Sequence, residues 1–392
     1  MNEIYLTIFF ISLLLFLLGS GVWVALSMIA VSAVGMLLFT TRPVGDAMAT
    51  TVWGTSSSWT LTALPLFVWM GEILFRTKLS ENLFKGLSPW LSKLPGGLIH
   101  VNVVGCALFA AISGSSAATV ATVGKMSIPE LRKRKYPEKL LLGSLAGSGT
   151  LGLLIPPSII LIIYGVTIED SIAKLFMAGI LPGIMIAILF MTYVVIWSIL
   201  NKKLMPKNVQ NFSFFKKIKR SKQLLPVVLL IISVIGSIYT GIATATEAAS
   251  LGVVGALILS WFQQTLSKET FKLSLLGATK TSCMIAFILA GSTFLSLAMG
   301  FTGLPRNLAI WIQEMNLSPY MLIFMLTIFY IILGMFLDGI SAVVLTMAII
   351  EPMIRQAGFD MIWFGIYLVI VVEMAQITPP VGFNLFVLQG MA

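Results

Sequence analysis

The segment "GSGTLGLLIPPSII", residues 147–160, places two adjacent prolines inside a run that carries no charge from Leu140 to Thr167. A second diproline lies in "EMAQITPPVGFNLF", residues 373–386. Proline has no backbone N–H, and its ring clashes with the carbonyl four residues earlier, so it kinks or breaks a helix. Two apolar segments far apart in the chain are therefore expected to break in the same way.

The composition identifies the environment of these segments. The chain has 392 residues, of which 58% are hydrophobic and only 10% are charged, whereas soluble proteins carry about 25% charged residues. The first ten residues, "MNEIYLTIFF", lack the basic region of a cleavable signal peptide. The two cysteines and the single histidine offer no metal-ligand spacing. The sequence thus predicts a polytopic protein of the lipid bilayer with no organic cofactor.

Two apolar runs, 99–130 and 319–352, are too long for one crossing and carry a Gly/Ser break at the centre, "ISGSSAAT" and "LDGISAVV". Each half is short for a crossing, which takes about 20 residues. We therefore expect two re-entrant helical hairpins whose tips stop inside the membrane. The other predicted spans are 4–39 (two short crossings around "GSG" at 19–21), 59–77, 140–165, 172–200, 224–241, 246–263, 273–300 and 361–388.

Basic residues predict the orientation, because cytoplasmic loops carry an excess of Lys and Arg. If 132–139, "RKRKYPEK", is cytoplasmic, the crossings place 202–222 and 264–272 on the same side. In this layout 20 of the 25 Lys and Arg residues lie at the cytoplasmic side. The net charge of +10 is then explained by topology. We interpret 202–222 as the linker between two halves of the chain, and we expect no nucleic-acid partner.

Three features recur in the same order in the two halves. Gly114 and Gly339 each begin a Gly-x-Ser-Ala motif, and Pro129 and Pro352 follow the hairpins. The diprolines are separated by 223 residues, as are Pro129 and Pro352. An odd number of crossings between the copies turns the second one upside down. Inverted repeats with broken helices are typical of secondary transporters. We therefore predict an all-α polytopic membrane protein, an inverted-repeat transporter with two re-entrant hairpins and two broken helices.

This interpretation divides the chain into fixed and moving parts. We expect the hairpins and broken helices to move together as an elevator against the remaining helices. Amphipathic stretches at 78–95 and 304–317 are expected to lie in the interfaces and connect the two parts. The expected divisions are N-terminal scaffold helices (1–98), the first hairpin with its broken helix (99–165), scaffold helices with a basic cytoplasmic linker at 201–223 (166–318), and the second hairpin with its broken helix (319–392).

The prolines predict where backbone oxygens are available. By the i−4 rule, the prolines at 156 and 157 free the carbonyls of Gly152 and Leu153, and those at 379 and 380 free the carbonyls of Ala375 and Gln376. Unpaired carbonyls at membrane depth must be buried or line a polar cavity. Hard cations prefer oxygen ligands of this kind. The breaks thus predict two symmetric sodium sites.

The hairpin tips are expected to complete these sites with hydroxyls and carbonyls, from Ser113, Gly114, Ser115 and Ser116 in one half and from Asp338, Gly339, Ser341 and Thr378 in the other. The ends of the half-helices favour an anion between the tips. Asp338 places a carboxylate within the membrane, and such a residue indicates a functional site. Glu72 and Glu373 are expected either to pair with a basic residue or to face an aqueous cavity, whereas Glu247 is expected to be solvated or to cap a helix.

The motifs "AISGSSAATVATVG", "GTLGLLIPPSI", "DGISA" and "ITPPVGFNLFV" resemble the large membrane subunit of TRAP (tripartite ATP-independent periplasmic) transporters. The resemblance spans nearly the whole chain. It implies sodium-driven uptake of a carboxylate or sulfonate, a periplasmic binding protein, a small four-helix membrane subunit and a location in the bacterial inner membrane. It also implies sodium ligands at Ser113, Ser116, Gly152, Ile155 and Pro157 in the first half, and at Gly339, Ala375 and Thr378 in the second.

Together these arguments define the predicted sites. The first sodium site comprises Ser113, Gly114, Ser116, Gly152, Ile155 and Pro157, and the second comprises Asp338, Gly339, Ser341, Ala375 and Thr378. The substrate is expected at Ser115, Thr150, Asp338 and Gln376. One departure from the family pattern is that the chain ends at Ala392, where a final helix is usual. We therefore expect a form that lacks this helix.

Three other functions are compatible with parts of the sequence. A stand-alone sodium/divalent-anion symporter of similar build would work without a binding protein. An intramembrane hydrolase would use Ser116 or Ser341 as nucleophile, but the sequence offers no evident base for either. A channel is a further alternative, although paired occluding hairpins suit alternating access better.

Overall fold

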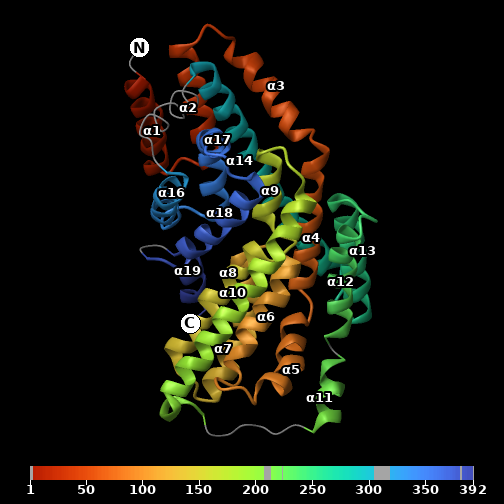
Figure 1. Ribbon diagram of the computed structural model, residues 1–392. Helices are drawn as coiled ribbons and strands as arrows, with labels where there is room; N and C mark the ends of the chain where they lie inside the picture. The colour runs from red at the N-terminus through yellow and green to blue at the C-terminus, as the bar shows by residue number, and fades with distance from the viewer. Residues whose placement is uncertain (1–2, 207–212, 223, 304–317, 380–381, 392) are drawn as a thin grey trace.

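The computed structural model describes residues 3–206, 213–222, 224–303, 318–379 and 382–391. Within these residues all regular structure is helical (Figure 1). Five helical segments of the described chain are at least 18 residues long and apolar enough to cross a bilayer, and shorter apolar helices accompany them. The prediction of an all-α polytopic membrane protein is confirmed.

The first half of the chain builds two N-terminal helices, a bent pair, a hairpin and a broken helix. In order these are α1 (Glu3–Gly19), α2 (Val24–Phe39), α3 (Val44–Ser56), η1 (Trp59–Thr62), α4 (Ala63–Phe75), α5 (Leu79–Leu91), α6 (Ile99–Ser113), α7 (Ser116–Lys133), α8 (Glu138–Leu154) and α9 (Ile159–Thr167).

The second half repeats this order after a connecting region. That region contains the long helix α10 (Ile172–Leu200), η2 (Lys202–Leu204) and α11 (Phe214–Ser221). The helices that follow are α12 (Leu225–Tyr239), α13 (Ala245–Phe262), α14 (Lys268–Thr302), α16 (Pro319–Gly334), α17 (Gly339–Gln356), α18 (Met361–Gln376) and α19 (Phe383–Gln389).

The repeat has a period close to 223 residues along the whole fold. Helices α7 and α17 begin 223 residues apart and end 223 residues apart, and α8 and α18 begin at the same separation. Helices α6 and α7 reach the lower end of the molecule, whereas α16 and α17 lie in the upper half (Figure 1). The two hairpins thus enter from opposite ends, as an inverted repeat requires.

The hairpin tips differ in one respect from the motif alignment. Gly114 ends α6 in the left-handed conformation, with φ of 59°, and Ser115 caps α7. Gly339, in contrast, is the first residue of α17, and Asp338 caps that helix. Ser115 and Asp338 are therefore the structural equivalents, and the shared Gly-x-Ser-Ala letters occupy positions two residues out of register.

Helix α3 was not among the predicted spans. Its sequence, "VGDAMATTVWGTS", is interrupted by Gly, Thr and Ser, so its hydrophobicity is low. In the structure α3 is bent by 52° from the η1–α4 segment and packs against α14. Residues 78–95, expected as a connecting amphipathic stretch, contain helix α5, whereas the stretch 304–317 lies outside the described residues.

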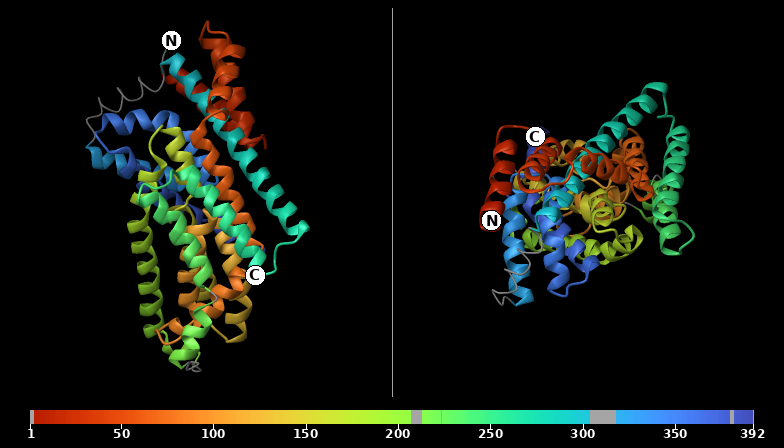
Figure 2. Two further views of the ribbon diagram at one scale, coloured as in Figure 1. Left: turned by 90° about the vertical axis from the view of Figure 1, so that its right-hand side faces the viewer. Right: turned by 90° about the horizontal axis from the view of Figure 1, so that it is seen from above.

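The outer surface of the molecule matches a lipid environment. Only 17% of the most apolar 18-residue stretch of α10 is buried within the chain, and large aliphatic side chains along α10 and α12 are exposed. The broken helix α8–α9 is the opposite case, because 89% of its most apolar 18-residue stretch is buried. The views of Figure 2 show the long helix α14 crossing the molecule beside α4. Hydrocarbon therefore contacts the periphery, and the first diproline lies in the interior.

Candidate functional site: the cavity between the hairpin tips

A cavity of about 620 Å³ lies where the two hairpin tips meet. The first tip contributes residues 113–118, and the second contributes residues 338–340. Gln376, from the end of α18, lines the same space. The opposite wall comes from α4 and α14, through Val68, Gly71, Glu72, Phe75, Thr281 and Met284. The two tips, 223 residues apart in the chain, thus share one cavity.

The first tip is held by a group of hydroxyls. The Ser113 and Thr119 hydroxyl oxygens lie 2.9 Å apart, and the Thr119 hydroxyl donates to the carbonyl of Ser115 over 2.7 Å. The Ser115 side chain accepts from the Ala118 N–H at the start of α7. A serine is a preferred helix cap, and here it is neutral. The amino end of α7 therefore faces the cavity without a compensating negative charge.

Two glycines allow the first tip to sit directly on the first break. A Cβ at Gly114 would lie 2.7 Å from the carbonyl oxygen of Pro157, and a Cβ at Gly152 would lie 2.6 Å from that of Ser115. The Ile159 N–H donates to the Gly114 carbonyl over 3.3 Å. The backbone of the first tip at 114–115 thus lies directly against the backbone of the broken helix at Gly152 and Pro157, which brings predicted members of the first sodium site together.

The break itself is buried and departs from helix at Ile155–Ser158. Pro156 supplies no N–H to the Gly152 carbonyl, as expected. The expectation for Leu153 was wrong, because the Ser158 hydroxyl turns back and donates to its carbonyl. The side chain of Ile155 packs against α10, where a Cβ at Gly183 would lie 2.7 Å from it. Gly152 thus remains as the carbonyl that the prolines leave without a helical donor.

The second tip carries a charged cap. One oxygen of the Asp338 carboxylate accepts from the N–H groups of Ile340 and Ser341, over 3.1 and 3.2 Å. Ser341 itself is buried. A carboxylate at this position compensates the positive end of the α17 dipole. The two tips therefore present opposite electrostatic characters to the same cavity.

Gln376 joins the two repeats across the cavity. The Ser116 hydroxyl donates to its side-chain oxygen over 2.8 Å, and a Cβ at Gly339 would lie 2.8 Å from its side-chain nitrogen. The glutamine is buried and is separated from Ser116 by 260 residues in the chain. Its side chain thus fixes the first tip relative to the second.

The second break is more open than the first. The Ala375 carbonyl, expected to be free, accepts from the Thr378 N–H over 3.0 Å, and the Thr378 hydroxyl donates to Met374. Pro379 is exposed, and Pro380 lies outside the described residues. The predicted Ala375 ligand therefore has a turn hydrogen bond at its carbonyl, which leaves the second lone pair of that oxygen for another partner.

Two further predicted polar residues lie behind the cavity wall. Thr150 is buried and donates to the Gly147 carbonyl over 2.7 Å, and it is not among the residues that line the cavity. Its repeat equivalent, Glu373, is also buried, and one of its carboxyl oxygens has no hydrogen-bond partner among the described residues. The side chains of Thr150 and Glu373 interact with each other.

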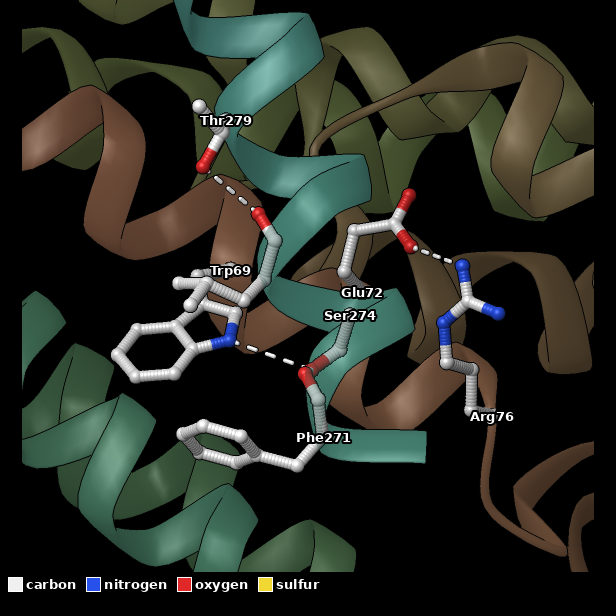
Figure 3. A network of polar contacts seen from close by, with 7 residues as sticks. Trp69, Glu72, Arg76, Phe271, Ser274 and Thr279 are labelled. Carbon is white, nitrogen blue, oxygen red and sulfur yellow. Dashed lines mark hydrogen bonds and ion pairs between the residues drawn. The ribbon is translucent and has the colours of Figure 1, made fainter. Parts of the chain in front are cut away.

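Sequence reasoning left open whether Glu72 pairs with a base or faces a cavity, and the structure shows both. Its carboxylate lies 3.0 Å from the Arg76 guanidinium and lines the cavity. A Cβ at Gly277 of α14 would lie 2.6 Å from the carboxylate, so the glycine makes room for it. Figure 3 shows this pair beside the Trp69 indole, which donates to Ser274 of α14 over 3.3 Å. Glu247 forms a capping box with Thr244, as one of its two expected roles.

The charge balance of the cavity is unusual for an anion site. Among the described residues that line it, two carry carboxylates, Glu72 and Asp338, and none is a lysine, arginine or histidine. Arg76 is the base paired with Glu72, and its Nε is buried with no hydrogen-bond partner among the residues that the structure describes. Among the described residues of the tips, positive potential therefore comes from the start of α7.

Known proteins resemble the chain over most of its length. The family profile of the DctM component of tripartite ATP-independent periplasmic transporters matches residues 10–392. A C4-dicarboxylate TRAP transporter large permease, DctM of Pseudomonas aeruginosa, is 34% identical over 356 residues, which cover 91% of this chain and 82% of that protein. The isethionate TRAP transporter permease DctMQ of Oleidesulfovibrio alaskensis is 32% identical, with 88% of this chain and 54% of that protein covered.

A solved structure shares the fold. The YdaH transporter of Alcanivorax borkumensis matches with a TM-score of 0.60 and 12% identity, over 94% of this chain and 89% of that one. The chain is a multi-pass inner-membrane protein, and its relatives are transporter permeases rather than enzymes. The chain belongs to the DctM family, the large permease component of tripartite ATP-independent periplasmic transporters.

Proposed function

We propose that the chain is the large permease subunit of a sodium-coupled importer of a small organic anion of the carboxylate or sulfonate type. The observation that carries this proposal is the charge of the cavity, where the described lining residues include two carboxylates and no basic side chain. Glu72 is paired with Arg76, so the Asp338 carboxylate is the charge that would repel an anion unless cations bind with it. Coupled sodium ions supply the positive charge.

Sodium is assigned to the two places where a tip meets a break. In the first repeat the support is the close approach of the Ser115 carbonyl oxygen to Gly152 and of the Pro157 carbonyl oxygen to Gly114, beside a largely buried, non-helical segment. In the second repeat it is the Asp338 carboxylate beside Gly339 and the turn at Ala375–Thr378. Oxygen-only surroundings suit a hard cation. The full proposed sets are those predicted from the sequence.

The anion is assigned to the first-repeat side of the cavity. The cap of α7 is the neutral Ser115, so the positive end of that helix is available to a carboxylate or sulfonate. The start of α17 already holds the Asp338 carboxylate. Ser115 and Gln376 therefore form the proposed contact group for the anion, with sodium ions on either side.

Transport requires that the tips reach the other side of the membrane. A second cavity of about 700 Å³ borders α3, α9, α14 and α17, and Ser292, Thr293 and Ser296 of α14 line it. The first cavity touches the same helix at Thr281. Eleven residues of helix correspond to ~16 Å at 1.5 Å per residue. We propose that the hairpins and broken helices carry the site over this distance, as an elevator.

The remaining subunits complete the system. A tripartite transporter implies two partners, which we assign as a small four-helix membrane subunit and a periplasmic protein that delivers the anion. The rival function is a stand-alone symporter that needs neither partner. The two functions differ in whether uptake requires the binding protein, and an uptake measurement distinguishes them.

The test is uptake into proteoliposomes that contain the chain with its small subunit. Labelled succinate and labelled isethionate are supplied with the candidate binding protein, and sodium and the binding protein are each omitted in turn. We expect that one of the two labelled probes is taken up, and only when sodium and the binding protein are both present. Equal uptake in sodium and choline would contradict sodium coupling, and uptake without the binding protein would favour the stand-alone symporter.

A further inference from the structure

The short helix α11 has two chemically distinct faces and lies outside the transport site. Phe214, Phe215 and Ile218 are exposed by 63%, 84% and 41%. At 100° per residue they share one side of the helix, Lys219 flanks that side next to Phe215, and Lys216 lies on the opposite side. Both lysines are exposed. An exposed apolar face beside a basic face is typical of a helix that lies in a membrane interface.

The chain connections hold α11 close to the bilayer surface. Helix α11 ends at Ser221, and the apolar helix α12 begins at Leu225. The residues between them span at most about 14 Å. Figure 1 shows α11 at the same end of the molecule as the basic loop after α7. Because basic loops mark the cytoplasmic side, the surface beside α11 is the cytoplasmic leaflet.

Contacts with α5 fix the direction in which α11 presents its faces. The Trp90 indole donates to the Ser221 hydroxyl over 2.7 Å, and the Lys217 ammonium lies 5.2 Å from the centre of the Trp90 ring. Phe214 packs edge-on against the same ring. A Cβ at Gly86 of α5 would lie 2.5 Å from Leu224, just before α12. Helix α11 is thus clamped on α5, while Phe215, Lys216 and Lys219 point away from it.

We propose that α11 is a binding site for anionic phospholipid headgroups of the cytoplasmic leaflet. Lys216 and Lys219 bind the headgroup phosphates, and Phe215 and Ile218 enter the boundary of the acyl chains. Charge complementarity selects the lipid, because a juxtamembrane basic cluster is attracted to an anionic leaflet and not to a zwitterionic one. Since α5 connects α4 to the first hairpin, the lipid also steadies the segment that joins them.

The experiment uses the full chain reconstituted into vesicles. Position 215 is labelled with an environment-sensitive fluorophore in the Phe215→Cys variant, in a Cys283→Ser background because Cys283 is exposed and Cys106 is buried. Emission is compared in vesicles of phosphatidylcholine and in vesicles that also contain phosphatidylglycerol. We expect a larger blue shift in the anionic vesicles, which concentrated sodium chloride reverses.

Two double variants test whether the lysines of α11 are required for the shift. Lys216→Gln/Lys219→Gln is expected to weaken the binding of phosphatidylglycerol by α11 about tenfold or more and to remove most of the blue shift. Lys202→Gln/Lys203→Gln removes the same charge from the neighbouring exposed residues of η2 and is expected to retain the shift. Equal emission in both kinds of vesicle would overturn the proposal, as would an equal loss in the two variants.

One further arm separates the source of the phosphate. Inorganic phosphate is added to phosphatidylcholine vesicles that contain the labelled chain. No shift is expected, because the apolar face needs the acyl boundary as well as the charge. A shift of the same size with inorganic phosphate would show a site for soluble phosphate and would overturn the assignment to lipid. Elution of each variant as a single species confirms that the fold is intact.

Discussion

The tips of the two hairpins begin equivalent helices, α7 and α17, but the residue that caps each helix differs in charge. Ser115 caps α7 through a neutral hydroxyl, whereas Asp338 caps α17 through a carboxylate that holds two N–H groups. The breaks differ as well, since Ile155–Ser158 is largely buried and Pro379 is exposed. The duplicated scaffold thus presents a helix start without a charged cap at one tip and a helix start compensated by a carboxylate at the other.

The asymmetry has a physical consequence for coupling. In the proposed account, main-chain and hydroxyl oxygens hold a sodium ion at each tip, and the second tip adds the fixed negative charge of Asp338. If the proposal is correct, sodium ions and the organic anion bind at neighbouring places in one cavity. Their mutual attraction then makes the binding of each favour the other.

Converting the first cap into the second should give the largest effect. Ser115→Asp places a carboxylate where the anion is assigned, and two unit charges 4 Å apart repel by about 4 kcal/mol at an effective dielectric constant of 20. We expect anion uptake to fall at least about tenfold. The measurement is the initial rate of uptake in proteoliposomes.

The control for this change is Ser115→Asn. Asparagine caps a helix as well as serine does but adds no charge. Uptake close to that of the unchanged protein is expected. If the Asp and Asn variants lose uptake equally, the loss comes from the shape of the tip, and the anion does not lie at the start of α7.

The reverse comparison neutralises the second tip. Asp338→Asn retains the cap of α17 and removes the charge, so the affinity for sodium should fall about tenfold, as expected for a lost charge-assisted contact of about 1.5 kcal/mol. The thermal midpoint in the absence of sodium should hardly change. Sodium titration of uptake and of the thermal midpoint gives both quantities. A tip that binds no sodium would leave the sodium titration unaltered.

The close approach of tip and break can be tested by adding one methyl group. Gly152→Ala introduces a Cβ 2.6 Å from the Ser115 carbonyl oxygen, and overpacking of this kind typically costs about 1–3 kcal/mol. The equivalent residue of the second repeat, Ala375, already carries that methyl. We therefore expect a lower thermal midpoint and weaker sodium stabilisation in this variant.

Gly143→Ala is the matched control, because it lies on the same helix and its Cβ would meet nothing within 4 Å. An exposed helix position gains up to about 1 kcal/mol from this change. Equal effects at positions 143 and 152 would show that α8, and not its contact with the tip, is sensitive to alanine.

The smallest effect is expected at the bridge between the repeats. Gln376→Leu gives the second repeat the residue that the first has at its equivalent, Leu153, and removes the bond from Ser116. A neutral hydrogen bond contributes about 1 kcal/mol. The thermal midpoint should fall slightly, and anion affinity should fall with it. An unchanged affinity would exclude Gln376 from the contact group.

Local sequence patterns predicted the hairpins, the broken helices and the inversion, because glycine, proline and basic loops act through nearby backbone and membrane topology. They did not predict α3, whose threonines and glycines conceal a helix that packs on α14. They also assigned a free carbonyl to Leu153, which Ser158 occupies. The errors concern contacts that depend on how the chain returns on itself.

In the candidate site too, local sequence patterns predicted some features, and contacts between distant parts of the chain determined the rest. The tips and breaks could be identified by residue type, yet the bridge from Ser116 to Gln376 spans 260 residues and leaves no local signal. The place of Glu72 depended on a glycine in another helix, Gly277. Equivalence at the tips was also misread by two residues, because the letters Gly-x-Ser-Ala do not reveal which residue caps the helix.

The central claim is that sodium ions supply the positive charge that the cavity wall lacks. The most direct measurement is a high-resolution cryo-EM comparison of the assembled transporter in sodium chloride and in choline chloride, each with the same concentration of added anion. The account predicts ion density between each tip and its break in sodium, and loss of both ions and of the anion in choline. An anion bound between the tips with no ion density in either condition would contradict it.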